Sequence, residues 1–225
     1  MKIQAAVFHK VHEPLTIETV EMDQPRAREI VVRTVATGVC HSDLHVIEGL
    51  GAYPTDGPFV LGHEGAGVVE AIGEDVTAFK VGDHVVACLS GFCGMCPQCL
   101  SGHPNVCTGG IATRAESEAP RLSQNGGLVR QFGGLGSYAE KMLVHENSVV
   151  RIDTDIAFDR AALVGCGVLT GVGAALRSSG MRAGQTVAVF GCGGVGLSIV
   201  QGARIGGARQ IIAVDQFDSK LEMAK

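Results

Sequence analysis

Residues 186–196 read TVAVFGCGGVG, a short apolar run followed at once by a glycine-rich turn. The apolar run is typical of a fully buried strand, and the glycines have the spacing G-x-G-x-x-G. An apolar helical stretch comes next, and IIAVD at 211–215 predicts a second buried strand. This order predicts a βαβ unit with two parallel strands, which is how a doubly wound α/β domain begins.

The spaced glycines predict a dinucleotide-binding turn. Gly191 makes the tight turn, Gly193 lets the backbone approach a pyrophosphate, and Gly196 lets helix and strand pack closely. Asp215 lies 19 residues after Gly196 and can accept both ribose hydroxyls, whereas it would repel a 2′-phosphate, so NAD is favoured over NADP. A glycine-rich turn without a ligand is the alternative. The predicted cofactor-binding residues of this unit are Gly191, Gly193, Gly194, Val195, Gly196 and Asp215.

The chain before residue 150 has the pattern of a mostly β domain. Short apolar runs rich in β-branched residues, separated by glycine, proline and aspartate, predict strands at 5–8, 30–39, 67–73 and 83–90. Segment 108–134 is polar and glycine-rich, and it is predicted to be a long surface excursion. From about residue 156 the pattern changes to helices with small residues that allow close packing.

Composition excludes several classes of function. The 225 residues are 46% hydrophobic and 18% charged, with a net charge of -5, so nucleic acid and anionic membranes are not expected partners. No run of eighteen apolar residues occurs, and MKIQAAVFHKVHEP lacks the pattern of a signal peptide. A cytoplasmic location follows as the expectation, and in a reducing compartment cysteines favour metal binding or catalysis over disulfides.

Four of the eight cysteines cluster in CGMCPQCLSGHPNVC at 93–107, with the spacing C-x2-C-x2-C-x7-C. Four thiolates close the coordination of a tetrahedral zinc ion, and such sites stabilise folds without leaving room for a substrate. An iron–sulfur cluster and a redox-active C-x-x-C pair are the alternatives.

A second set of metal-binding side chains is scattered along the chain. GVCHSDLH (38–45) supplies Cys40, LGHEGAGVVEAIGEDV (61–76) supplies His63, and GCGVLTG (165–171) supplies Cys166. Each alone is more often a packing residue, since free cysteine behaves as a small hydrophobe. Together they offer two thiolates and one imidazole, which is a ligand set of an open, catalytic zinc site.

These motifs resemble one family. The run GHEGAGVVEAIGEDV matches G-H-E-x2-G-x5-G-x2-V of the zinc-containing alcohol dehydrogenases, in the medium-chain dehydrogenase/reductase superfamily, and the other motifs occur in the same order as in that family. The long 108–134 segment is most similar to the class I/III and related bacterial branch. The resemblance implies an α+β then α/β chain. It would have a GroES-like catalytic domain at 1–168 with a structural zinc lobe at about 91–108, and an incomplete Rossmann domain at 169–225.

The resemblance also implies the metal ligands. Cys40, His63 and Cys166 would bind catalytic zinc, with Glu64 nearby or as an alternate ligand. The structural zinc ligands would be Cys93, Cys96, Cys99 and Cys107.

Further roles follow from the same resemblance. Ser42 matches the hydroxyl that passes on the alcohol proton, and His45 the imidazole that delivers it toward solvent. Asp43 matches the carboxylate that orients the ligand histidine. His41 matches a position near the cofactor pyrophosphate, and Lys220 one that contacts the adenosine ribose.

The implied activity is reversible hydride transfer between a primary or secondary alcohol and NAD, through a zinc-bound alkoxide and the Ser42/His45 relay. Two zinc ions per chain, a small-molecule alcohol or aldehyde and a homo-oligomer are expected. The alternatives are a glutathione- or mycothiol-linked formaldehyde dehydrogenase and an inactive zinc-binding fragment. The fragment is considered because the chain ends inside a predicted helix after Asp215, which suggests truncation.

Overall fold

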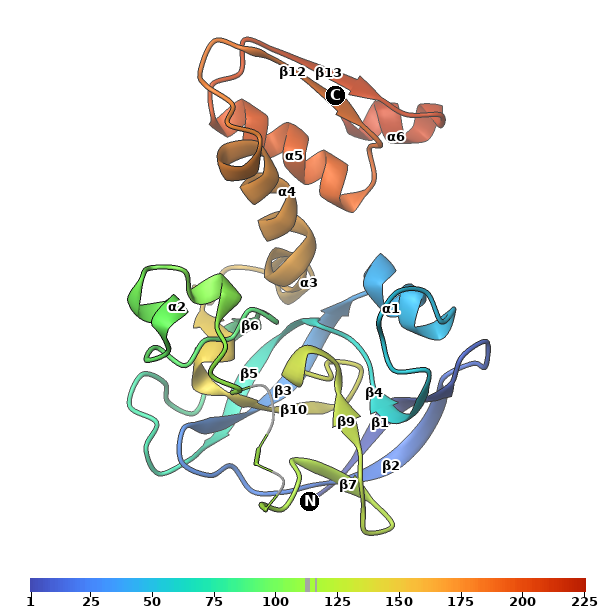
Figure 1. Cartoon of the computed structure of the whole chain (residues 1–225), viewed down its shortest axis with the longest axis vertical. Helices are drawn as coiled ribbons and strands as arrows, with labels where there is room; N and C mark the ends of the chain where they lie inside the picture. Colours follow the sequence, from blue (N-terminus) through green and yellow to red (C-terminus); the bar gives the residue numbers. More distant parts are fainter. Residues whose placement is uncertain (112–113, 116) are drawn as a thin grey trace. The chain divides into compact units, whose positions relative to one another are not determined.

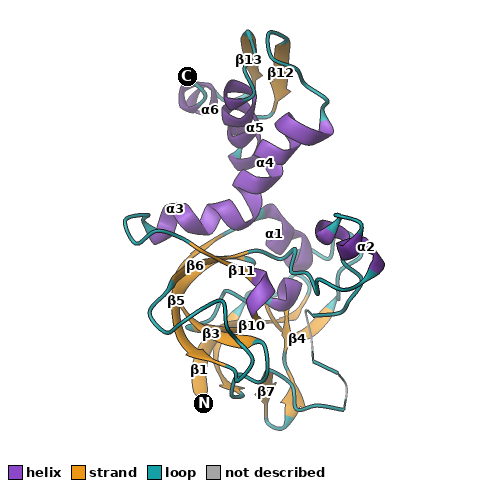
Figure 2. Cartoon of the chain, turned by 90° about the vertical axis from the view of Figure 1, so that its left-hand side faces the viewer, coloured by secondary structure: helices purple, strands orange, loops and turns teal. Residues whose placement is uncertain are grey.

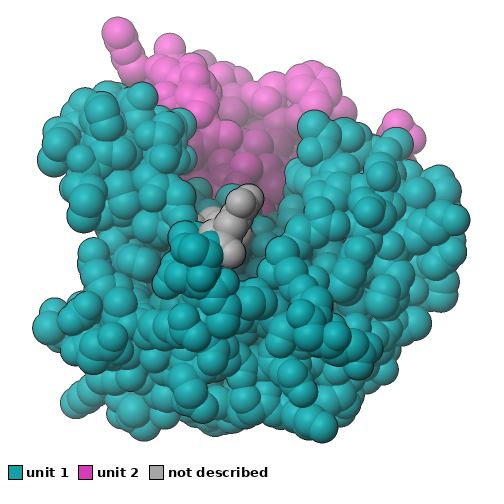
Figure 3. Space-filling model, turned by 60° about the horizontal axis from the view of Figure 1, so that its bottom comes forward, with its two compact units in different colours: residues 1–165 teal, residues 166–225 magenta. Residues whose placement is uncertain are grey.

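The computed structural model describes residues 1–111, 114–115 and 117–225. The chain divides into two compact units, residues 1–165 and residues 166–225, which Figure 3 draws in different colours. The first unit consists mainly of two β-sheets, and the second is a small α/β unit (Figure 1).

The first sheet has six strands in the order β8-β7-β2-β1-β4-β9. Its central strand β1 alternates, with Ile3, Ala5 and Val7 buried, so the period of two places one face in the core. The strands are β1 Lys2–Lys10, β2 Thr16–Met22, β4 Asp56–Val60, β7 Leu122–Gln124, β8 Gly127–Leu128 and β9 Arg130–Gln131.

The second sheet has five strands in the order β10-β3-β5-β6-β11. On β3, Val31 joins the core cluster of the first sheet, whereas Ile30 and Val32 belong to a second cluster on the other side. A strand buried on both faces explains the continuous apolar run in the sequence. The strands are β3 Glu29–Gly38, β5 Glu64–Ile72, β6 His84–Ala87, β10 Lys141–His145 and β11 Val149–Arg151.

Short helices complete the first unit (Figure 2). Ala161 and Ala162 on α3 pack against Ala66 of β5, where small side chains let the helix approach the sheet. The helices are α1 His41–Ile47, α2 Pro97–Leu100 and α3 Phe158–Leu163, with 3-10 turns at Pro104–Val106, Phe132–Gly134 and Glu146–Ser148.

The second unit contains the predicted βαβ unit. Strand β12 (Thr186–Phe190) pairs in parallel with β13 (Gln210–Val214), and helix α5 (Gly194–Ile205) connects them. Helix α4 (Leu169–Gly173) packs against α5 at Gly171, where an added Cβ would lie 2.4 Å from the Cβ of Ser198. Helix α6 (Asp218–Met223) ends the chain, and π-helical turns occupy Val164–Val168 and Ala174–Ser178.

The architecture agrees with the predicted fold class: a mostly β unit is followed by a unit with one parallel βαβ motif. The prediction that 108–134 is a long surface excursion is wrong, because β7, β8 and β9 lie in it and Leu122 and Val129 are each 1% exposed. Strands of two or three residues are too short to display alternation in a sequence. Residues 112, 113 and 116 of that segment lie outside the described residues.

One helical stretch, Phe158–Ser178, is long and apolar enough to cross a membrane by length and composition alone. A single such helix is weak evidence, because core helices of soluble proteins meet the same criteria.

Candidate metal centres

The first candidate centre begins where β3 ends. Cys40 stands directly before α1, and its backbone N–H donates to Oδ2 of Asp43 at 3.2 Å. Ser42 Oγ lies 3.7 Å from Cys40 Sγ. The rings of His41 and His45 meet edge to face with centroids 4.9 Å apart. Among the described residues, no direct hydrogen bond joins Ser42 to His45, so a proton relay between them needs a bridging group.

His63 approaches the same place from the turn before β5. Its side chain is 1% exposed, and Nδ1 lies 3.3 Å from Oδ1 of Asp43. Nε2 is also buried, and it has no hydrogen-bond partner among the described residues. A buried polar atom without a partner is costly, and a histidine held by a carboxylate through one nitrogen is the usual form of a metal ligand.

Glu64 follows His63 and is 3% exposed. Gly38 allows this carboxylate to approach β3, because an added Cβ there would lie 2.0 Å from Glu64 Oε2. The ligand atoms of Cys40, His63 and Glu64 all lie within 4.8 Å of one another. Sulfur, imidazole nitrogen and carboxylate oxygen are the three donor types that zinc accepts, so these residues fit a zinc ion.

The ionisation of this cluster favours a bound cation. Burial opposes the thiolate of Cys40, but hydrogen bonds from Ser42 and the charge of the facing His63 outweigh it and lower the pKa of the thiol. Burial also opposes the charged form of His63, yet Asp43 raises the pKa of the imidazole. The lowered pKa favours the thiolate of Cys40, which is the form of cysteine that binds metal.

Cys166 is the first residue of the second unit. It follows Gly165, whose backbone lies tightly against the first unit, since an added Cβ would be 2.0 Å from the carbonyl oxygen of Ala87. Its role as a ligand stays a prediction.

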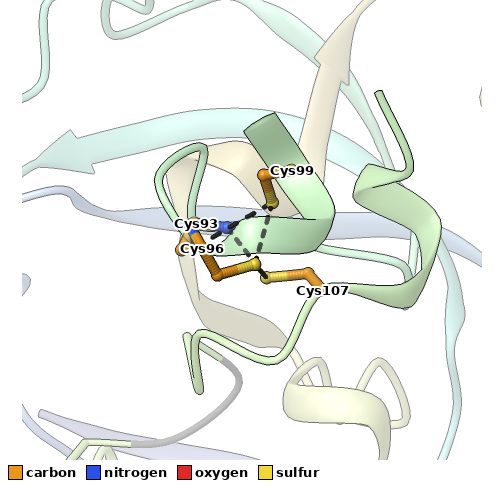
Figure 4. A group of neighbouring side chains, drawn as sticks. All are labelled: Cys93, Cys96, Cys99 and Cys107. Atoms are coloured by element: carbon orange, nitrogen blue, oxygen red, sulfur yellow. Dashed lines mark hydrogen bonds between the residues drawn. The ribbon is translucent and has the colours of Figure 1, made fainter. Parts of the chain in front are cut away.

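The second candidate centre is the cysteine lobe (Figure 4). The sulfur atoms of Cys93, Cys96, Cys99 and Cys107 lie within 4.8 Å of one another, and all four cysteines are free thiols. The N–H groups of Met95 and Cys96 donate to Cys93 Sγ at 3.4 and 3.3 Å. Backbone donors aimed at sulfur stabilise thiolates, which are the form that binds metal.

The lobe cannot hold four negative sulfurs without a cation. Backbone N–H groups of Cys99 and Thr108 lower the pKa of Cys96 to about 5. Burial and the neighbouring sulfur atoms raise the pKa of Cys99 to about 11. These opposite directions express repulsion between sulfurs in one small space, which a zinc ion relieves. The lobe therefore fits a closed structural zinc site.

The glycine turn of the second unit is held by Asp215. Oδ2 accepts the N–H of Cys192 at 2.7 Å, and Oδ1 accepts the N–H of Phe217 at 3.0 Å. These two backbone N–H groups lower the pKa of Asp215. Gly191 has φ +91°, and at Gly196 an added Cβ would lie 1.8 Å from the carbonyl oxygen of Gly191. The Lys220 ammonium stands 5.1 Å from the centre of the Phe217 ring.

Sequence reasoning missed two residues near His63. Phe132 meets the His63 ring edge to face with centroids 5.0 Å apart. Tyr138 donates from its hydroxyl to Oδ2 of Asp43 at 3.0 Å. Burial and the Asp43 charge raise the pKa of Tyr138, so the hydroxyl stays protonated. Both lie in the segment between β9 and β10, in which no motif marked them.

Comparisons with known proteins identify the family. A family profile described as the alcohol dehydrogenase GroES-like domain matches residues 26–154. S-(hydroxymethyl)glutathione dehydrogenase from Saccharomyces cerevisiae is 42% identical over 228 residues, covering 98% of this chain and 58% of the relative. NDMA-dependent alcohol dehydrogenase from Amycolatopsis methanolica is also 42% identical over 228 residues, covering 100% of this chain and 61% of the relative.

A solved structure is similar over the whole chain. Benzyl alcohol dehydrogenase from Acinetobacter calcoaceticus has a TM-score of 0.89 and 37% identity, covering 100% of this chain and 61% of that protein. The chain thus spans about three fifths of the length of these proteins. Since the family profile covers more than half of the sequence and the zinc-binding motifs lie in the expected order, the chain belongs to the zinc-containing alcohol dehydrogenase family.

Proposed function

We propose that this chain acts in an NAD-dependent, zinc-dependent alcohol dehydrogenase, which interconverts a primary or secondary alcohol with its aldehyde or ketone. The observation that carries the proposal is the buried Nε2 of His63, which has no hydrogen-bond partner among the described residues and lies in one cluster with Cys40 and Glu64.

Cys40, His63 and Cys166 are the proposed ligands of the catalytic zinc, with Glu64 as a nearby or alternate ligand. The zinc ion, when bound, supplies Lewis acidity that lowers the pKa of a hydroxyl. Asp43 keeps the proton of His63 on Nδ1, so that Nε2 presents its lone pair.

Ser42 and His45 are proposed to move the alcohol proton. Ser42 stands next to the sulfur of Cys40, a proposed ligand, where a substrate hydroxyl would lie, and the imidazole of His45 can accept and release a proton. A water molecule or a hydroxyl group has to bridge the two. His41, beside His45, is proposed to lie near the cofactor pyrophosphate.

The second unit is proposed to bind NAD. The turn formed by Gly191, Gly193, Gly194, Val195 and Gly196 leads into the N-terminus of α5, which favours negative phosphates. Asp215 would accept the ribose hydroxyls with the lone pairs that its two backbone donors leave free. Lys220 is proposed to contact the adenosine ribose, and the chemistry of hydride transfer belongs to the nicotinamide.

The remaining predictions concern assembly and location. We propose that the cysteine lobe holds a second, structural zinc ion, that the protein is cytoplasmic and that it forms a homo-oligomer. A small alcohol or aldehyde is the proposed partner, without nucleic acid or membrane.

The test is metal content and turnover of the protein with an alcohol and aldehyde panel. We expect two zinc ions per chain and NAD-dependent oxidation of alcohols. Cys40→Ala and His63→Ala should each abolish this oxidation. Full activity and full zinc content in Cys40→Ala would contradict the proposed site.

A second candidate is a thiol-adduct formaldehyde dehydrogenase. The name of the Saccharomyces cerevisiae relative, S-(hydroxymethyl)glutathione dehydrogenase, favours it. A higher kcat/KM for S-(hydroxymethyl)glutathione than for benzyl alcohol would support this candidate. A higher kcat/KM for benzyl alcohol would support the general alcohol dehydrogenase. A protein that binds zinc but reduces no NAD with either substrate would be an inactive zinc-binding fragment.

A further inference from the structure

The carboxylate of Asp43 is 1% exposed and is surrounded by four hydrogen-bond donors. Oδ1 faces the N–H of Gly62 at 2.9 Å and Nδ1 of His63 at 3.3 Å. Oδ2 accepts the N–H of Cys40 at 3.2 Å and the hydroxyl of Tyr138 at 3.0 Å. Three of these donors come from the two segments that carry the proposed ligands. Tyr138 alone belongs to a third segment.

Tyr138 is fixed independently of Asp43. Its N–H donates to the carbonyl of Leu61 at 3.0 Å, and its carbonyl accepts the N–H of Ala6 at 2.8 Å, which ties it to β1. Its ring lies against Gly62, where φ is +85° and an added Cβ would stand 2.4 Å from Cδ1 of the ring. The hydroxyl therefore points at Asp43 from a backbone that is tied both to β1 and to the residues just before His63.

A single hydroxyl matters here because a carboxylate can rotate. With Oδ2 bonded to Tyr138 and Cys40, Oδ1 stays directed at His63 Nδ1. This holds the proton on Nδ1 and leaves the buried Nε2 free as a lone-pair donor in the ligand cluster. Groups that orient a ligand from outside the coordination sphere typically change metal affinity by about 10–100-fold when removed.

We propose that Tyr138 is a positioning residue of the catalytic metal site: its hydroxyl fixes Asp43, and Asp43 fixes His63 for coordination. This inference rests on the proposed function, since it assumes that His63 binds a metal ion.

The substitution Tyr138→Phe tests it, because the ring that packs on Gly62 stays and only the hydroxyl is lost. Zinc affinity of the two sites is measured on the whole chain by competition with a chelator. Cobalt(II) absorption assigns each site, since an all-thiolate site and a mixed sulfur–nitrogen site have different spectra. The expected result is about 10–100-fold weaker binding at the Cys40/His63 site and unchanged binding at the cysteine lobe.

Tyr53→Phe is the matched control, because Tyr53 is the other tyrosine of the chain and its ring contacts Phe132. Its zinc affinities should equal those of the unchanged protein. Equal affinity of Tyr138→Phe at the Cys40/His63 site would overturn the proposal for Tyr138, and so would an equal loss at both sites, which indicates a general loosening of the fold. An unchanged protein that binds metal only at the cysteine lobe would instead overturn the proposed function.

Discussion

His63 Nδ1 lies 3.3 Å from Oδ1 of Asp43, and both side chains are almost fully buried. The pair joins helix α1 to the residue before β5, and it leaves the opposite ring nitrogen of His63, Nε2, without a hydrogen-bond partner among the described residues. Asparagine has nearly the same shape as aspartate but carries no charge. Replacing Asp43 with asparagine therefore tests the charge of the carboxylate while the side chain keeps its size.

Asp43→Asn should weaken zinc binding at this site by about 10–100-fold, because a neutral amide no longer stabilises the Nδ1–H form of His63. Activity should fall with the zinc content. The measurement is zinc retained at rising chelator concentration. Asp56→Asn is the control, since the Asp56 side chain is 83% exposed, and it should behave as the unchanged protein. Equal zinc retention by both variants would show that Asp43 does not orient His63.

The two cysteine sets should respond differently to loss of one sulfur. Cys40→Ala should remove one zinc ion per chain with little change in Tm, because the proposed site would have an open position and Cys40 is in none of the hydrophobic core clusters. Cys96→Ala should lower Tm clearly, since a closed zinc site contributes directly to folding. Zinc analysis and thermal unfolding measure both. Cys88→Ala, outside both clusters, should keep both zinc ions. A larger fall in Tm for Cys40→Ala than for Cys96→Ala would reverse the two assignments.

Glu29 is another buried acid, and it binds Arg114 and Arg121 at the start of β3. It accepts from Arg121 Nε at 2.7 Å and from Arg114 Nη2 at 2.5 Å, and all three side chains are at most 8% exposed. Glu29→Gln removes the buried carboxylate that both guanidinium groups share, and Arg114 then keeps, among the described residues, only its ion pair with Asp23, so the free energy of unfolding should fall by about 3–5 kcal/mol. Urea unfolding measures it. Glu70→Gln, from a half-exposed pair, should lose less than about 1 kcal/mol. If both variants lose a similar free energy of unfolding, the buried ion pairs of Glu29 stabilise the fold no more than the more exposed pair of Glu70.

The same network gives a pH dependence. Burial opposes the charged form of Glu29, but Arg114 and Arg121 outweigh it and lower the pKa of the carboxyl below 4.5. A lowered pKa in the folded state means that the stabilisation is complete above about 4.5 and is lost as the pH falls toward the folded value. The unchanged protein should lose stability more steeply below pH 4.5 than Glu29→Gln, which has no such proton to bind. The measurement is the urea midpoint of both proteins at a series of pH values around and below 4.5. Parallel profiles would contradict the lowered pKa.

The sequence predicted well those features that depend on local pattern. The strand at 186–190, the glycine turn and the parallel strand near 211–215 are confirmed, because glycine spacing and continuous apolar runs have one main structural meaning. The family is confirmed for a related reason, since its motifs combine rare residues at fixed spacing. Domain boundaries and the roles of individual site residues stay predictions.

Features made by distant residues could not be predicted in this way. Tyr138 and Asp43 are 95 positions apart, and Arg121 and Glu29 are 92 apart. A tyrosine or arginine in a polar segment gives no local sign of a buried partner on another strand. The same reason explains the error at 108–134, where short strands take their stability from the sheet that they join and not from their own sequence.

The last prediction concerns cofactor choice. Asp215 accepts backbone N–H groups of Cys192 and Phe217, which lower its pKa and keep the carboxylate charged at neutral pH. Asp215→Asn keeps an oxygen for Cys192 but removes the charge that repels a 2′-phosphate. The ratio of kcat/KM for NADP to that for NAD should therefore rise by about tenfold or more, which corresponds to roughly 1.4 kcal/mol.

Asp215→Gly should raise the same ratio, while both cofactors bind more weakly because the turn loses its acceptor. Asp218→Asn, in the first turn of α6, controls for charge alone. If Asp218→Asn changes selectivity as much as Asp215→Asn, or if neither changes it, Asp215 does not face the ribose. The test of Asp215 is the ratio of kcat/KM for NADP to that for NAD, because a less ordered turn would lower both values of kcat/KM together.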